Sequence, residues 1–181
     1  DRQLMLGSKQ VDSALWLFWV AQQYAQFTGD KKEAWAKLRS KLVAIAKTLN
    51  SGARMGVTLC ENGLLKAKMN GVAMTWMNAY NSEGIPVTER GGFQVEVNAL
   101  WYNAIAYLVD METQFGSDKR SIQRWSEIKN QIEANFYNLF WTDKYHHLAD
   151  YIDENGVQNV FTRPNQIFAC ALEYSPISED V

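Results

Sequence analysis

The chain has 181 residues, of which 47% are hydrophobic and 21% are charged, and its formal net charge is −2. This apolar fraction excludes a disordered chain, and the length suits one core of ordinary size. No run rich in Lys or Arg exists, so we expect no nucleic-acid partner. The chain has seven Trp, which serve either a large core or stacking surfaces for flat ligands such as sugar rings.

The longest apolar stretch, residues 14–21, is too short to cross a bilayer, and residues 1–10 lack the layout of a signal peptide. Cys60 and Cys170 are isolated and lie near no His cluster. This spacing indicates neither a disulfide framework nor a zinc site, although two cysteines can also pair. We therefore expect a cytoplasmic protein with no membrane partner and no metal site.

Residues 12–28 predict the first helix, which is apolar on every face over residues 14–21 and so is typical of a helix buried all round. Gly29 ends it. The next predicted helix, about 31–50, is amphipathic and covers the core with one face. Its apolar stripe consists of Trp35, Leu38, Leu42, Ile45 and Leu49.

The same pair of helices recurs further along the chain. Residues 95–115 predict a second apolar helix, and residues 119–140 predict a second amphipathic one. A third apolar segment opens at Pro164. A buried helix that alternates with an amphipathic one, at a repeat of about 85 residues, indicates a repeated helical hairpin.

These hairpins predict an all-α fold, in which buried helices form an inner ring and amphipathic helices surround them. Two pairs, about 12–50 and 95–140, and the start of a third inner helix near 164 cannot close such a ring. Residues 1–181 are therefore predicted to be a single partial domain, an incomplete α/α toroid. We expect the remainder of a longer chain or another copy to cover the open arc. A simple bundle of four or five helices is the alternative.

The connections between the pairs carry the unusual residues. Asn62-Gly63, between two apolar runs, predicts a β-hairpin. Residues 70–92 form a connection long enough to indicate a functional loop. A second long connection, residues 142–162, carries His146-His147, which we interpret as surface residues.

Parallel inner helices place their N-terminal ends, and the loops before them, at one end of the ring. Asp12, residues 76–96 and Arg163-Pro164-Asn165-Gln166 fall there, so acids, amides, Arg and Trp gather together. Saccharide sites need this mixture, because polar groups bind hydroxyls and aromatic faces stack on sugar rings. The long loops are predicted to form this active-site end, together with the small hairpin.

Each of these residues also has a structural interpretation. Asp12 can be an N-cap, and Glu96 suits the first turn of a helix because of the helix dipole. Trp16 and Trp101 suit a core. Arg90 can pair with a neighbouring glutamate.

Five blocks of the sequence carry a family resemblance in the right order. They are Val11-Asp12-Ser13-Ala14-Leu15-Trp16, Thr75-Trp76-Met77-Asn78-Ala79, Pro86-Val87-Thr88-Glu89-Arg90, Val95-Glu96-Val97-Asn98-Ala99-Leu100-Trp101-Tyr102-Asn103-Ala104 and Arg163-Pro164-Asn165-Gln166. The chain resembles, over essentially its whole length, the amylo-α-1,6-glucosidase domain of glycogen debranching enzymes.

The resemblance implies an (α/α)6 barrel, an α-glucan partner (glycogen or limit dextrin) and no cofactor. It implies hydrolysis of the α-1,6-linked glucose at a branch point, with inversion at the anomeric carbon. Inversion needs a carboxylic acid and a carboxylate base about 6.5–9.5 Å apart. The substrate-binding residues implied are Asp12, Trp16, Trp76, Arg90, Glu96, Asn98, Trp101, Arg163, Asn165 and Gln166.

This chain departs from the family at the catalytic position. Asn78 stands where the family has the Asp that resembles a general acid, and Glu89 replaces a proline. The family's candidate base lies beyond the block that Arg163 opens. The sequence thus predicts part of a glycoside hydrolase that is inactive on its own. The alternatives are a non-catalytic glycan-binding homologue and, disfavoured by the long loops, a helical-repeat interaction module.

Overall fold

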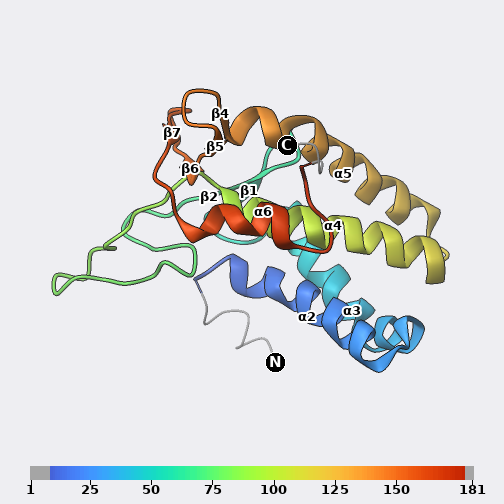
Figure 1. Cartoon of the computed structure of the whole chain (residues 1–181). Helices are drawn as coiled ribbons and strands as arrows, with labels where there is room; N and C mark the ends of the chain where they lie inside the picture. Colours follow the sequence, from blue (N-terminus) through green and yellow to red (C-terminus); the bar gives the residue numbers. More distant parts are fainter. Residues whose placement is uncertain (1–8, 178–181) are drawn as a thin grey trace.

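A computed structural model describes residues 9–177 of the chain, and about half of the residues are helical (Figure 1). The helices are α2 (Asp12–Thr28), α3 (Lys31–Asn50), α4 (Val95–Phe115), α5 (Lys119–Phe140), the 3-10 helix η1 (Pro164–Ile167) and the short α6 (Phe168–Ala171). The first four match the predicted ranges. The predicted third apolar segment begins as η1 and continues as a single turn of α-helix.

The described strands form three small antiparallel sheets. They comprise β1 (Val57–Leu59) with β2 (Leu65–Ala67), β4 (Trp141–Thr142) with β5 (His147–Leu148), and β3 (Phe93–Gln94) with β6 (Tyr151–Ile152) and β7 (Gln158–Asn159). The β1–β2 pair confirms the hairpin predicted at Asn62-Gly63. The connection 142–162 has more structure than the sequence predicted, because its strands of two residues are too short to show an alternating pattern.

The outer helices begin at aspartate caps. The Asp30 side chain accepts a hydrogen bond from the Glu33 N–H at 2.8 Å. Asp118 accepts from the Arg120 and Ser121 N–H groups at the start of α5. These bonds satisfy N–H groups that have no partner within the helix, so each cap fixes where its helix begins.

Helix α4 is the centre of the core. It packs against α2, α3, α5 and α6, and every residue over 95–108 is buried. The prediction of a helix buried all round is confirmed for α4, because helices and strands contact it from several sides.

Helix α2 differs from that prediction. Leu15, Phe18 and Ala21 are buried, whereas Trp19, Val20, Tyr24 and Phe27 are exposed by 38%, 49%, 40% and 94%. The prediction that α2 is buried all round is therefore wrong for the part of the chain that the structure describes. The reason is that α3, α4 and the α6 segment pack on one side of α2, and nothing within 9–177 covers the other.

Helices α2 and α4 lie side by side and run in the same direction, as predicted. Asp12 bonds to the loop before α4, while Gln22, ten residues further along α2, donates to Asn103 of α4 at 3.1 Å. Figure 1 shows α2, α4 and α6 all starting at the left, where the green loop 70–92 extends, while α5 returns in the opposite direction. The helix N-terminal ends and this loop therefore meet.

We expect Gly63→Ala to lower the free energy of unfolding by about 2 kcal/mol. Gly63 has φ 81°, and an added Cβ would lie 2.8 Å from the Gln131 Cβ and 3.0 Å from the Ile132 nitrogen of α5. Both the left-handed backbone and the clash contribute. The control is Gly84→Ala, which has φ 76° but open space around it, and which should cost only about 1 kcal/mol. Urea denaturation of both variants measures the difference; equal losses would contradict the role of the α5 contact.

Candidate functional site

A buried ionic cluster lies where the N-terminal ends meet. Arg90 is 4% exposed, and its guanidinium lies between two carboxylates. Its Nη2 donates to Glu96 Oε2 at 2.7 Å, its Nη1 donates to Glu96 Oε1, and its Nε donates to Asp150 Oδ2 at 2.8 Å. Arg163 Nη1 donates to the same Asp150 oxygen at 2.5 Å. We call these four residues, Arg90, Glu96, Asp150 and Arg163, the ionic cluster.

Backbone pairing assembles the ionic cluster from four separate segments. Glu96 lies in the first turn of α4, directly after β3, and Asp150 directly precedes β6. Because β3 pairs with β6, the Val95 N–H donates to the Asp150 carbonyl at 3.1 Å. Arg163 precedes η1. The β3–β6 pairing thus places the two carboxylates on either side of Arg90.

Asp150 was missed in the sequence analysis, although it is the hub of the cluster. It is fully buried and accepts hydrogen bonds from Arg90, Arg163 and Asn165. The sequence carries one signal of this role. Asp150 is a lone acid in the otherwise apolar run Leu148-Ala149-Asp150-Tyr151-Ile152, and a charged residue in a buried segment needs partners.

Burial dominates the electrostatics of the carboxyls at this end. Burial raises the pKa of Glu96, and the bonds from Arg90 oppose this shift. A helix N-terminus by itself lowers the pKa of a carboxyl in the first turn, so burial acts against the helix dipole here as well. Burial likewise raises the pKa of Asp12, against the N–H groups of Trp76 and Ser13.

Trp76 is an exposed aromatic side chain that is anchored at both of its ends. Trp76 is 47% exposed, yet its indole Nε1 donates a hydrogen bond to Asn165 Oδ1 at 2.9 Å. Its backbone N–H donates to Asp12 Oδ2 at 3.1 Å. Asp12 is the first residue of α2 rather than its N-cap, so its carboxylate binds the loop instead of capping the helix in the usual way.

Asn78 lies two residues further along the same loop and is exposed. Its backbone N–H donates to the Trp76 carbonyl at 2.9 Å. Two more hydrogen bonds hold this loop: the Ala73 N–H donates to the Tyr80 hydroxyl, and the Val87 N–H donates to the Ala79 carbonyl. Asn78 is therefore an exposed residue whose backbone is held to the Trp76 carbonyl.

The remaining predicted residues lie elsewhere or are engaged by the fold. Asn98 is fully buried and clamps β2, since it accepts from the Leu65 N–H at 2.7 Å and donates to the Leu65 carbonyl at 3.0 Å. Trp101 is fully buried and donates to the Gly63 carbonyl. Trp16 packs edge-on against Trp19 and Phe168. Gln166 is half-buried and donates to the Leu148 carbonyl.

The structure thus brings together Asp12, Trp76, Arg90, Glu96, Arg163 and Asn165, with Asn78 next to them. Glu96 and Asp150 have their oxygens occupied by guanidinium and amide donors. Among these residues, Trp76 and Asn78 are exposed and can meet a ligand. An aromatic face beside an amide suits a sugar ring, whose faces are apolar and whose edge carries hydroxyls.

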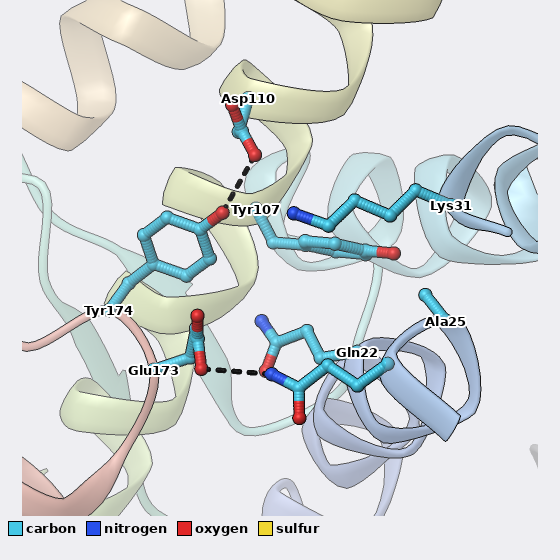
Figure 2. Close-up of a pocket in the computed structure, with 8 residues that line it drawn as sticks. Gln22, Ala25, Lys31, Tyr107, Asp110, Glu173 and Tyr174 are labelled. Carbon is cyan, nitrogen blue, oxygen red and sulfur yellow. Dashed lines mark hydrogen bonds between the residues drawn. The ribbon is translucent and has the colours of Figure 1, made fainter. Parts of the chain in front are cut away.

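A separate pocket lies near the C-terminal half of α2, between α2, α4 and residues 173–174 (Figure 2). Tyr174 donates to Asp110 at 2.8 Å across it, and Gln26 donates to Glu173 at 3.1 Å. Its volume is about 20 Å³, which is room for one water molecule. The pocket is too small for a sugar and lies away from the ionic cluster.

Within residues 9–177, no three His, Cys, Asp or Glu side chains gather into a group that could hold a metal ion. Cys60 and Cys170 are both free thiols. No helix in that part of the chain is long and apolar enough to cross a membrane.

The comparisons with known proteins give one match. A family model described as amylo-alpha-1,6-glucosidase matches residues 7–181. No curated protein and no solved structure matches the chain. Since the family match covers nearly every residue and agrees with the resemblance of the five blocks, the chain belongs to the amylo-alpha-1,6-glucosidase family.

Proposed function

We propose that this chain is part of a cytoplasmic glycoside hydrolase that removes α-1,6-linked glucose at branch points of glycogen or limit dextrin. Family membership supports the reaction class. The observation that carries the proposal is the anchored, exposed Trp76, with the exposed Asn78 two residues further along the same loop, at the end where α2, α4 and η1 begin. A rigid aromatic face next to a polar amide is suited to bind one glucose unit.

We also propose that the chain forms part of an (α/α)6 toroid. The inner α2 and α4 run side by side, and α3 and α5 pack outside them. The exposed apolar face of α2 carries Trp19, Val20, Tyr24 and Phe27. Such a face supports the assignment of α2 as an inner helix that a further helix would cover. Further hairpins of a longer chain, or a second copy, would cover this face.

The proposed reaction is an inverting acid–base hydrolysis. In this chain Trp76 stacks on the glucose ring, and Asn78 hydrogen-bonds to a hydroxyl or to the glycosidic oxygen. An amide does not protonate a leaving group, so the parent protein must supply a carboxylic acid from elsewhere. Glu96 and Asp150 are unsuited to that role, because both are buried and held by Arg90.

A second candidate function is glycan binding without catalysis, and Asn78 at the general-acid position is the observation that favours it. Such a homologue keeps the indole platform and the ionic cluster but transfers no proton. The two functions differ in one measurable respect. The hydrolase releases free glucose from a bound branch, whereas the binder retains the branch intact.

Glucose release from a phosphorylase limit dextrin tests the proposal. We expect the parent protein to release glucose, and the isolated 181-residue chain to release none above the buffer control. The reason is that the two carboxyls of an inverting site cannot be assembled from the exposed groups beside Trp76. Turnover by the purified chain would contradict this prediction. Binding of limit dextrin by the parent without glucose release would establish the non-catalytic alternative.

A further inference from the structure

We propose that Asp150 is a positioning residue that fixes the plane of the Trp76 indole through Asn165. The contacts run from the buried carboxylate, through a buried amide, to the exposed ring. We call this series of contacts, Asp150 to Asn165 to Trp76, the relay. Asn165 Nδ2 donates to Asp150 Oδ1 at 2.6 Å, and Asn165 Oδ1 accepts from Trp76 Nε1 at 2.9 Å. That the fixed indole binds a glucose ring rests on the proposed function.

The donors and acceptors of this relay allow only one orientation of the amide. An indole N–H is a donor only, so the Asn165 oxygen must face it. The Asn165 nitrogen must then face Asp150. Asp150 Oδ1 already accepts from Arg90 Nη2 at 3.0 Å, and its Oδ2 accepts from both Arg90 and Arg163. Because guanidinium donors hold both oxygens as acceptors, Asp150 sets the direction of the amide, and the amide sets the direction of the indole.

The relay supplies the constraint that the loop itself lacks. Trp76 lies on the long connection 70–92 and is 47% exposed, whereas Asn165 and Asp150 are fully buried. The bond from the Trp76 backbone to Asp12 fixes the main chain but leaves the side-chain torsions free. The bond to Asn165 fixes those torsions. A ring that is already ordered loses less conformational entropy when a ligand stacks on it, so it binds more tightly.

Fluorine NMR on chain labelled with 5-fluorotryptophan tests the relay directly. The Trp76 resonance is identified as the one missing from Trp76→Phe. In Asn165→Leu we expect this resonance to move towards the position of the free amino acid, while the other resonances stay in place. We expect the same shift in Asn165→Asp, which keeps the shape of the side chain but sets a second carboxylate against Asp150. An unchanged Trp76 resonance in both variants would overturn the proposal.

Saccharide binding, measured by isothermal titration calorimetry with isomaltose in every variant, tests the consequence. We expect the dissociation constant to rise about two- to tenfold in Asn165→Leu, which corresponds to the cost of ordering one large side chain on binding. Trp76→Phe should weaken binding, and adding Asn165→Leu to it should weaken binding no further, because both changes break the same bond.

The matched controls lie away from the relay. Asn138→Leu on α5 changes an exposed Asn, and Trp19→Phe changes an exposed Trp of α2; neither should alter isomaltose binding. Asp150→Asn should move the Trp76 resonance if the variant folds, and the two Asn165 variants decide the matter if it does not. A moved resonance in a chain whose wild type binds no isomaltose would support the positioning role and overturn the glucose site. Isomaltose binding by a chain whose Trp76 resonance stays in place in the Asn165 variants would support the glucose site and overturn the positioning role.

Discussion

Replacing Arg90 by alanine should lower the free energy of unfolding of the chain by about 3–5 kcal/mol. The change removes the guanidinium that pairs with Glu96 and Asp150, which are 1% and 0% exposed. Glu96 would then be a buried carboxyl without a charged partner, and Asp150 would keep Arg163 as its charged partner beside the Asn165 amide. Urea denaturation followed by circular dichroism measures the loss.

Two further variants distinguish the loss of stability caused by breaking the ionic cluster from a general effect of losing an arginine. Arg124→Ala removes an exposed guanidinium of α5 and should change stability by less than about 0.5 kcal/mol. Arg90→Met combined with Glu96→Leu should recover part of the loss, because it removes the buried carboxyl together with its partner. A loss below about 1 kcal/mol in Arg90→Ala would contradict the view that the ionic cluster holds this end of the fold together.

The helices could be predicted because their signals are local. The apolar run of α4, the stripe of α3 and the Asp30 cap are each contained in a few consecutive residues, and the structure has the same bounds. The burial of α2 could not be predicted in the same way. Its sequence shows that the helix is apolar on all faces, but which face is covered depends on what else packs there.

The sequence predicted which segments meet at this end of the fold, but not the hydrogen bonds between their side chains. The expectation that parallel helices bring Asp12, Arg90, Glu96 and Asn165 to one end is met by their contacts. Asp150 escaped notice because its role depends on the β3–β6 pairing, and strands of two residues leave no periodic pattern. The clamp that Asn98 forms on Leu65 has the same origin, since it joins residues 33 positions apart in the sequence.

Asn78→Asp in the parent protein should raise the hydrolysis of α-1,6-linked glucose by at least about a hundredfold, the lower end of what a positioned general acid contributes. By its resemblance to the family, Asn78 stands where the family has its acid, two residues after Trp76, and a protonated aspartate there has about the same size and a proton to donate. The side chain is exposed within the described part of the chain. An exposed aspartate is ionised near neutral pH, and burial by the rest of the parent would raise its pKa.

This pKa gives the prediction a pH dependence of definite sign. Only the protonated carboxyl donates, so the gain of the variant over the wild type should grow as the pH falls from about 7 towards about 4. If neighbouring parts of the parent bury the residue, the pKa rises and the gain persists to higher pH.

The matched control is Asn81→Asp, which places the same charge in the same loop, where the Asn81 side chain only supports a turn. This control should change the rate less than about twofold, because its carboxyl lies outside the proposed site. Rates of glucose release from limit dextrin decide the matter: a wild type that is already fast, or a variant with no gain at any pH, would show that the proton comes from another residue.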